Sequence, residues 1–210
     1  MALSNKEQMR SAIREIVETL LLALVIYLVI QSLINTFEVR GASMEPSFHD
    51  GQRILVNKAV YFNFNPSQFA KFISFIKSTD EGQPVYLFHP PQRGDVIVFR
   101  PPYNSQEPFI KRIVGLPGET VEIREGKIYV DSRVITEPYT KDSPRYTVPP
   151  EQVPPDHYFV LGDNRNNSSD SHVWGMVPRE NILGKAWVTY WPMSQLDMVP
   201  HYSQLPDTNK

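Results

Sequence analysis

Ser43 lies in sequence surroundings that favour nucleophilic chemistry. In Gly-Ala-Ser-Met-Glu-Pro at 41–46, small residues and a proline leave the backbone with little steric cover. The 210-residue chain has no cysteine, so a protein nucleophile has to be Ser, Thr or Lys. A serine hydroxyl needs a base. The five histidines are scattered and no Gly-x-Ser-x-Gly turn is present, so the sequence does not indicate a Ser–His pair.

Lys111 is the better candidate for the base. It lies in Phe-Ile-Lys-Arg-Ile-Val at 109–114, where strand alternation places it between Phe109 and Ile113 on one face. If that face is buried, desolvation lowers the pKa of the lysine from about 10.4 toward the roughly 7 to 8 that a general base needs. A strand lysine that snorkels to solvent or pairs with an acid is the ordinary alternative.

A third feature is the stretch Gly-Asp-Asn-Arg-Asn-Asn-Ser-Ser-Asp-Ser at 162–171, in which nearly every side chain can form hydrogen bonds. Apolar residues flank it on both sides, at 158–161 and 173–174. A solvated turn is one interpretation of such a loop. The flanking residues favour a second one, in which the loop packs against the domain.

The elements that have to position these residues are mostly strands. Alternating or apolar runs between turn residues predict strands at 54–56, 95–99, 109–114, 120–123, 127–130, 157–161 and 186–191. Arg-Glu-Gly at 124–126 predicts a hairpin turn. Of the 19 prolines, 13 lie between residues 84 and 155, which excludes long helices there. Residues 67–78 have one apolar helical face and predict a short helix that lies on a bilayer or packs on the sheet.

The N-terminal region is different, because residues 20–30 form an unbroken apolar run. As a helix, residues 16–37 would extend about 33 Å, enough to cross a membrane. A cleavable signal peptide fits the run too, but no small-x-small pair follows it directly. We therefore expect a retained anchor at 16–37, with a buried core helix as the other alternative. Lys6, Arg10 and Arg14 place residues 1–15 in the cytoplasm and residues 38–210 outside it.

Composition excludes several classes of function. With 21 Lys and Arg against 23 Asp and Glu, the formal charge of −2 argues against a nucleic-acid partner. The sequence has no His-Glu-x-x-His motif or other metal-ligand spacing, so we expect no metal and no cofactor. The oligomeric state cannot be derived from the sequence, and we take a monomer as the default.

Taken in order, these motifs resemble type I signal peptidases, the membrane-anchored Ser/Lys proteases that remove signal peptides from exported proteins. The resemblance rests on the anchor, Ser-Met-x-Pro at 43–46, Gly-Asp-Val-Ile-Val-Phe at 94–99, Lys-Arg-Ile-Val-Gly-Leu-Pro-Gly at 111–118 and Gly-Asp-Asn-Arg at 162–165 with Ser168, Asp170 and Trp174. It implies a mainly β, signal-peptidase-like fold of the LexA type, with a single N-terminal transmembrane helix as in shorter bacterial members.

The resemblance also implies roles for the candidate residues. Ser43 is expected to be the nucleophile and neutral Lys111 the general base, which later protonates the leaving amine. The backbone N–H of Ser43 is expected to bind the oxyanion. Some members add a serine hydroxyl at the position of Gly41, so the second oxyanion donor stays open here.

Four residues of the polar stretch are implied as support for the lysine. Ser168 matches a serine that hydrogen-bonds and orients the base, and Asp170 and Arg165 match an ion pair beneath it. Asp163 lies near the same site. Many members have arginine where this chain has His172, which leaves the partner of Asp170 open.

Substrate recognition follows from the same resemblance. Shallow apolar pockets are expected to accept small side chains one and three positions before the cut, and an extended substrate is expected to add to a strand edge at 37–40 or 106–111. The residues matched to the pockets are Val39, Met44, Phe48, Phe109 and Ile110. Core packing is the alternative role for each of them.

The implied partners are preproteins that carry signal peptides and the lipid bilayer. The expected location is the bacterial plasma membrane, and another energy-transducing membrane such as the thylakoid fits as well. Three alternatives stay open: a specialised pilin or conjugation-type maturation peptidase of the same superfamily, a catalytically silent membrane-anchored binding protein, and a LexA-type self-cleaving repressor. The repressor would carry a DNA-binding domain in place of the anchor, which argues against it.

Overall fold

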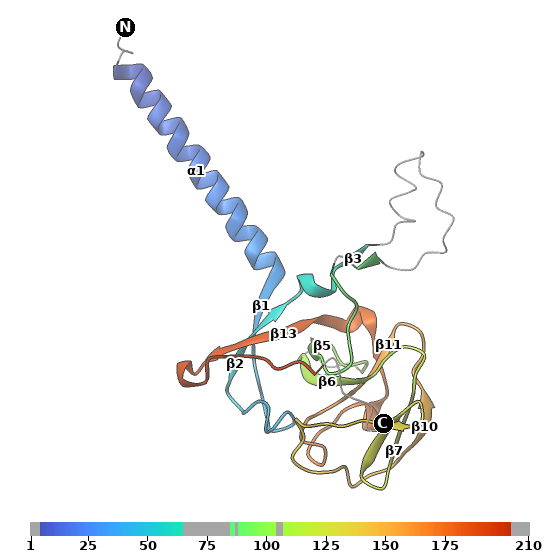
Figure 1. Cartoon of the computed structure of the whole chain (residues 1–210). Helices are drawn as coiled ribbons and strands as arrows, with labels where there is room; N and C mark the ends of the chain where they lie inside the picture. The colour runs from blue at the N-terminus through green and yellow to red at the C-terminus, as the bar shows by residue number, and fades with distance from the viewer. Residues whose placement is uncertain (1–4, 65–84, 87, 104–106, 203–210) are drawn as a thin grey trace, which may run out of the picture.

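The computed structural model describes residues 5–64, 85–86, 88–103 and 107–202, and shows a long N-terminal helix attached to a β-rich domain (Figure 1). Helix α1, Asn5–Leu33, extends away from the domain. Strand β1, Ile34–Glu38, follows it directly and joins the main sheet. The predicted fold class, mainly β with an N-terminal apolar helix, is confirmed.

Helix α1 carries its apolar side chains without protein cover. Leu20 and Leu22 are 64% and 61% exposed. The segment Gln8–Leu33 is long and apolar enough to cross a membrane. The helix ends at Leu33 and not at Phe37, where the predicted anchor ends, because residues 34–37 pair with the neighbouring strand in antiparallel register.

The main sheet places the expected base in an interior strand. Its order is β1-β2-β13-β5-β6-β11-β12, and β14 pairs with β13. Each of these pairs is antiparallel. The remaining bounds are β2 Arg53–Asn57, β5 Val96–Phe99, β6 Phe109–Gly115, β11 His157–Leu161, β12 Val177–Pro178, β13 Ile182–Trp191 and β14 Asp197–Met198.

A second antiparallel sheet has the order β10-β7-β8-β9, with β7 Thr120–Arg124, β8 Lys127–Val130, β9 Arg133–Val134 and β10 Val148–Gln152. The predicted hairpin joins β7 to β8, where Arg124 pairs with Lys127. Glu125 and Gly126 between them have φ of 50° and 71°, values that a two-residue hairpin turn requires. The seven predicted strands all lie in these two sheets.

The other elements are short. Strands β3, Asn63–Phe64, and β4, Val85–Tyr86, pair with each other. The short helices are η1 Ala59–Tyr61, α3 Ser171–Trp174, η2 Arg179–Asn181 and η3 Met193–Gln195. The helix predicted at 67–78 lies outside the described residues.

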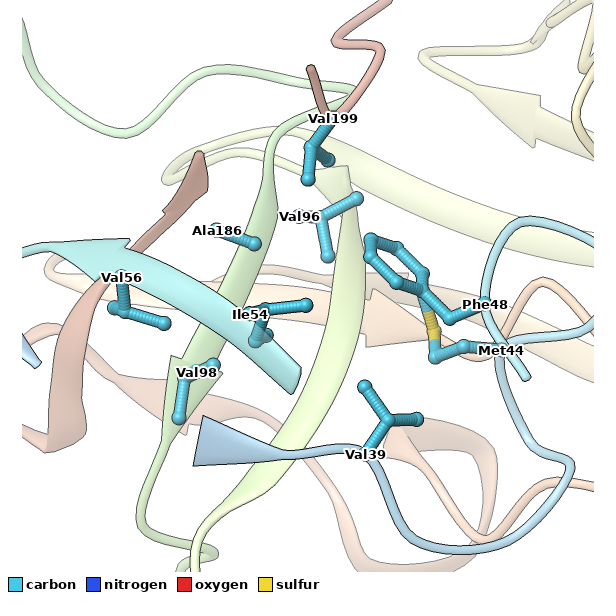
Figure 2. Packing of buried hydrophobic residues seen from close by; sticks show 9 residues of the cluster. All are labelled: Val39, Met44, Phe48, Ile54, Val56, Val96, Val98, Ala186 and Val199. Carbon is cyan, nitrogen blue, oxygen red and sulfur yellow. The ribbon is translucent and has the colours of Figure 1, made fainter. Parts of the chain in front are cut away.

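One of the hydrophobic clusters ties the segment around Ser43 to the main sheet (Figure 2). Met44 and Phe48, both 1% exposed, leave the loop after β1 and pack with side chains of β2 and β5. Burial of two large side chains stabilises this loop by about 3–6 kcal/mol. The loop therefore has a fixed position relative to the sheet, which a catalytic nucleophile requires.

Candidate active site

The nucleophile candidate lies in a loop that is closed at its base. The Val39 N–H donates to the Gln52 carbonyl at 2.7 Å, and the Gly51 N–H donates back to the Val39 carbonyl at 2.9 Å. Within the loop, the Glu45 N–H donates to the Ala42 carbonyl at 3.2 Å. Residues 39–52 thus form a compact loop at the end of β1, with Ser43 near its start.

Lys111 reaches Ser43 from strand β6. Its Nζ lies 2.7 Å from Ser43 Oγ and donates to the Ile110 carbonyl at 2.9 Å. The predicted strand face is confirmed: Ile113 is fully buried, and the Lys111 ammonium lies 5.6 Å from the centre of the Phe109 ring. Two residues 68 positions apart in the sequence therefore form one polar pair in an apolar setting.

Burial sets the proton affinity of Lys111. The residue is 4% exposed, and desolvation lowers its pKa from 10.5 to about 8. The negative charges of Asp170 and Asp163 act in the opposite direction and raise this pKa. A substantial fraction of Lys111 is therefore neutral at mildly alkaline pH, and its lone pair then faces the Ser43 hydroxyl.

The polar loop at 162–171 packs against the loop of Ser43, as the second sequence interpretation expects. Asn164 donates its backbone N–H to the Ser43 carbonyl at 3.1 Å and its side-chain amide to the Ala42 carbonyl at 3.0 Å. A Cβ added to Gly162 would lie 2.4 Å from the Ser43 carbonyl oxygen and 2.3 Å from Ser168 Oγ. Only glycine allows this approach of the two loops.

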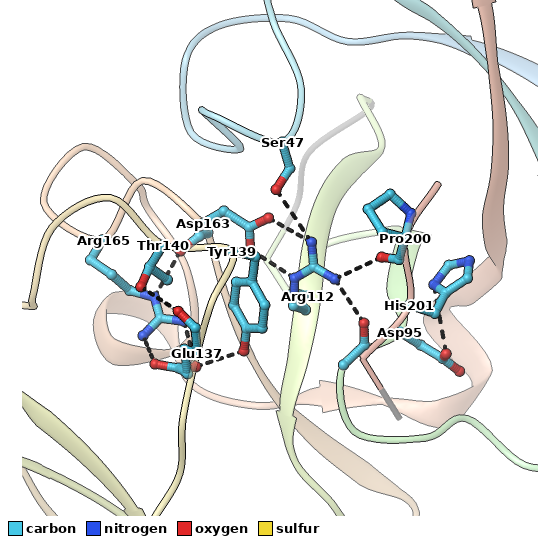
Figure 3. A network of polar contacts seen from close by, with 12 residues as sticks. Ser47, Asp95, Arg112, Glu137, Tyr139, Thr140, Asp163, Arg165, Pro200 and His201 are labelled. Atoms are coloured by element: carbon cyan, nitrogen blue, oxygen red, sulfur yellow. Dashed lines mark hydrogen bonds and ion pairs between the residues drawn. The ribbon is translucent and has the colours of Figure 1, made fainter. Parts of the chain in front are cut away.

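Two buried arginines, Arg112 from β6 and Arg165 from the polar loop itself, fix this loop to the domain (Figure 3). Arg112, fully buried, forms two hydrogen bonds of 2.9 and 2.7 Å with the carboxylate of Asp163 and lies over the ring of Tyr139. Arg165 forms a bidentate pair with Glu137 and donates to the Gly162 carbonyl at 3.1 Å. Bidentate pairs of this kind fix geometry as well as charge.

The expected ion pair between Asp170 and Arg165 is wrong, because Arg165 binds Glu137 instead. The side chain beside Asp170 is that of His172, whose Nδ1 lies 2.6 Å from Asp170 Oδ1, and the His172 ring stacks on Tyr146 with the ring centres 3.8 Å apart. The other carboxylate oxygen accepts the Gly162 N–H at 2.9 Å. Asp170 also accepts the backbone N–H of His172 at the start of α3.

Ser168 does not make the hydrogen bond to Lys111 that the resemblance implies. Its hydroxyl is buried beside Gly162 and makes no hydrogen bond with any described residue. Lys111 bonds to Ser43 and to its own strand instead. The orienting role implied for Ser168 stays a prediction.

The two oxyanion candidates differ in their availability. Gly41 has a φ of +77° and donates its N–H to Asp50 Oδ1 at 2.6 Å, so this donor already has a carboxylate partner. The Ser43 N–H has no acceptor among the residues that the structure describes. Of the two candidates, Ser43 N–H is the one free to bind a developing oxyanion.

A cavity of about 510 Å³ opens beside Ser43 and Lys111. Its walls are residues 36–40 at the end of β1 and residues 107–111 at the start of β6, with Ser43, Ile54, Val98 and Ser169. Three of the five predicted pocket residues line it: Val39, Phe109 and Ile110. Met44 and Phe48 do not line it and lie in the hydrophobic cluster of Figure 2.

No described group of three or more His, Asp or Glu side chains suits a metal ion.

A family model described as "Signal peptidase, peptidase S26" matches residues 13–191. The chain belongs to this family. The predicted resemblance and enzyme class are therefore confirmed.

Relatives of the same kind cover most of the chain. "Probable signal peptidase I-1" of Synechocystis is 35% identical over 92% of this chain and 90% of that protein. "Signal peptidase I" of Pseudomonas aeruginosa is 33% identical over 87% of this chain and 74% of that protein. "Thylakoidal processing peptidase 1, chloroplastic" of Arabidopsis thaliana is 33% identical over 79% of this chain and 44% of that protein.

Sequence reasoning did not find four residues that contact the site. Glu137 and Tyr139 lie in a proline-rich segment that gave no strand pattern, and their burial beneath the polar loop comes from tertiary packing. Asp50 follows the Ser43 motif without periodicity. Asn164 was part of the polar stretch, but nothing in its sequence position indicated that it binds the nucleophile loop.

Proposed function

We propose that the chain is a membrane-anchored serine endopeptidase that removes N-terminal signal peptides, with Ser43 as nucleophile and Lys111 as general base. The observation that carries this proposal is the 2.7 Å separation of Lys111 Nζ and Ser43 Oγ in a buried setting. A neutral amine at this distance can take the hydroxyl proton directly. The membership of the signal peptidase family supports the substrate class.

The reaction proceeds in two stages. In the first, Lys111 removes the proton from Ser43 Oγ as this oxygen attacks the scissile carbonyl, and the Ser43 N–H stabilises the resulting oxyanion. The Lys111 ammonium then gives its proton to the leaving amine, and an acyl-enzyme ester on Ser43 remains. In the second stage, Lys111 activates a water that hydrolyses this ester and restores the free hydroxyl.

The cavity accounts for a preference for small side chains. An extended substrate adds to the free edge of β1, because Val39 directs its N–H and carbonyl toward residues 51–52 and so leaves those of its neighbours facing the cavity. Phe109 and Ile110 line the cavity next to Lys111 and would limit the size of a side chain bound there. Such a shape discriminates by clash against residues larger than alanine, which fits an Ala-x-Ala-like site.

Residues 16–33 of α1 form the membrane-spanning part of the enzyme in this proposal. Residues 1–15 lie in the cytoplasm and residues 38–210 outside it. Because Ser43 follows the last helical residue, Leu33, by only ten residues, the dyad works close to the bilayer surface. The membrane is the bacterial plasma membrane, and the thylakoidal relative makes a thylakoid location the alternative. The residues of the proposed site all belong to one chain, so a second copy is not needed to complete it, and we propose that the enzyme acts as a monomer.

The test uses the full-length protein in detergent with a preprotein whose signal ends in Ala-x-Ala, and the cut is mapped by mass spectrometry. Cleavage directly after the second Ala is expected for the native chain, and none for Ser43→Ala or Lys111→Ala. Ser169→Ala is the matched control, because Ser169 lines the same cavity and has no proposed chemical role. A folded native protein that cleaves only pilin-like substrates, or none, would move the assignment to the maturation peptidase or to the silent binding protein.

A further inference from the structure

Asn164 makes two hydrogen bonds to consecutive carbonyls of the nucleophile loop. Its side-chain amide donates to the Ala42 carbonyl at 3.0 Å and its backbone N–H donates to the Ser43 carbonyl at 3.1 Å. The residue comes from the polar loop, 122 positions from Ala42 in the sequence. It is half-buried and does not line the cavity of the proposed active site.

The direction of the Ala42 carbonyl determines the direction of the Ser43 N–H. Both groups belong to one peptide unit, which is planar and trans, so the N–H points opposite to the carbonyl. When the Asn164 amide holds the Ala42 oxygen, the Ser43 N–H points away from the polar loop. This N–H has no acceptor among the described residues, as an oxyanion donor requires.

Two other hydrogen bonds fix the nucleophile loop, but neither of them ties the peptide unit between Ala42 and Ser43 to the rest of the domain. Asp50 holds the Gly41 N–H, which belongs to the peptide unit between Arg40 and Gly41, two units before the one between Ala42 and Ser43. The Glu45 N–H also donates to the Ala42 carbonyl, but this bond of 3.2 Å lies within the loop and moves with it. Among the described side chains, the Asn164 amide is the link that ties the peptide unit between Ala42 and Ser43 to the rest of the domain.

We infer that Asn164 is a positioning residue for the oxyanion site: its side-chain amide holds the peptide unit between Ala42 and Ser43 so that the Ser43 N–H faces the developing negative charge. This inference rests on the proposed function. It matters in this chain because Gly41 has no hydroxyl to add a second donor and its own N–H is bound to Asp50. Without the Asn164 side-chain amide, the Ser43 N–H is still present but no longer held in the direction of the oxyanion.

Two variants and one matched control test the inference. Asn164→Asp keeps the side-chain shape but puts an oxygen against the Ala42 carbonyl, and Asn164→Ala removes the contact. Asn166→Asp is the control, because the Asn166 amide donates to the Ser143 carbonyl at 3.0 Å, in the same loop but away from Ser43. Asn164→Ser replaces either variant that does not fold in detergent.

The measurements distinguish a misdirected Ser43 N–H from weaker substrate binding. With the Ala-x-Ala preprotein, kcat is expected to fall about tenfold in both Asn164 variants, the effect of one lost hydrogen bond, while KM changes less than twofold. The inhibition constant of a peptide aldehyde ending in Ala, which forms a tetrahedral adduct on Ser43, is expected to rise by the same factor. The product peptide is expected to bind as before, and the pH midpoint of activity to stay in place.

Three outcomes of these measurements would contradict the role inferred for Asn164. An unchanged kcat in Asn164→Asp, a loss confined to KM, or equal losses in Asn164→Asp and Asn166→Asp would each overturn the inference and leave the proposed function intact. If the native chain cleaves no preprotein, the proposed function itself fails. The native chain therefore distinguishes the two failures.

Discussion

Lys111 and Arg112 are consecutive residues of β6, and both are almost fully buried, at 4% and 0% exposed. Arg112 has the carboxylate of Asp163 beside it and keeps a balanced charge. Lys111 has no ion pair within the described part of the chain, and its nearest polar partner is the neutral hydroxyl of Ser43. Strand alternation thus places Arg112 in an ion pair and leaves the buried Lys111 without one, which is the physical basis of its proposed role as a base.

Activity is expected to rise with pH through the pKa of Lys111. This pKa is lowered to about 8, and only the neutral amine can take the Ser43 proton, so activity is low at pH 6 and levels off above about pH 9. The measurement is kcat/KM for one preprotein between pH 6 and 10, with unfolding checked at each pH. A profile that stays flat down to pH 6 would identify a different base.

Lys111→Met is expected to inactivate the enzyme and stabilise the fold at low pH. Below pH 8 the native chain holds a buried ammonium, which costs about 3 kcal/mol relative to an exposed one. Loss of the hydrogen bonds to Ser43 and Ile110 offsets part of this gain, which leaves about 1–2 kcal/mol. Between pH 8 and 10.5, Lys111 keeps its proton in the unfolded state but has lost it in the native state. The free energy of unfolding of the native chain therefore rises over this range, and the advantage of the variant disappears.

Urea unfolding of both full-length proteins in detergent at pH 6 and pH 10.5 measures this effect. The contrary result is a variant that is less stable than the native chain at pH 6. It would mean that packing and hydrogen bonds of Lys111 outweigh its desolvation.

Asp170→Asn is expected to shift the activity profile to lower pH. The negative charge of Asp170 raises the pKa of Lys111, so its removal lets desolvation lower that pKa further below 8. We also expect a stability loss of about 1–3 kcal/mol, because the Gly162 N–H and His172 lose a charged partner. The pH midpoint of kcat/KM is the readout. A midpoint that moves upward would show that the carboxylate does not act on the lysine through its charge.

The sequence predicts most of the framework around the dyad. The alternation at 109–114 is sufficient to place Lys111 on one face with Phe109 and Ile113, and the apolar runs are sufficient to find seven strands. That this face is buried follows only from the structure, in which Arg112 and Val114 of the opposite face are buried too. Strand β10 was not predicted because its sequence Val-Pro-Pro-Glu-Gln has two prolines, which a strand at the edge of a sheet tolerates. Residues 34–37 fall within the predicted anchor because extension to Phe37 gives a helix long enough to cross a membrane, but Asn35 and Thr36 are polar and this segment forms β1.

Partners across the site were harder to predict than the site itself. Arg165 was expected to bind Asp170, and it binds Glu137, 28 residues away in a segment without periodicity. Met44 and Phe48 lie beside the nucleophile in the sequence, yet their side chains turn into the core. Such choices depend on which groups meet in three dimensions, and local patterns do not contain that information.

Gly162→Ala leaves Ser43 and Lys111 unchanged. We nevertheless expect it to reduce activity more strongly than other substitutions near these two residues that leave them unchanged. The added methyl group would lie 2.4 Å from the Ser43 carbonyl oxygen, a backbone atom that cannot rotate away. The polar loop and the nucleophile loop therefore have to separate, which we expect to lower stability by about 1–3 kcal/mol and kcat by about 100-fold. Thermal unfolding and cleavage of the Ala-x-Ala preprotein by the full-length chain measure both effects. Gly118→Ala is the control, because Gly118 has a φ of +88° but open space around its Cβ position, so it carries backbone strain without a clash. Gly162 itself does not have a positive φ, so equal losses of activity in the two variants would assign the effect to a general loss of stability and not to the contact between the two loops.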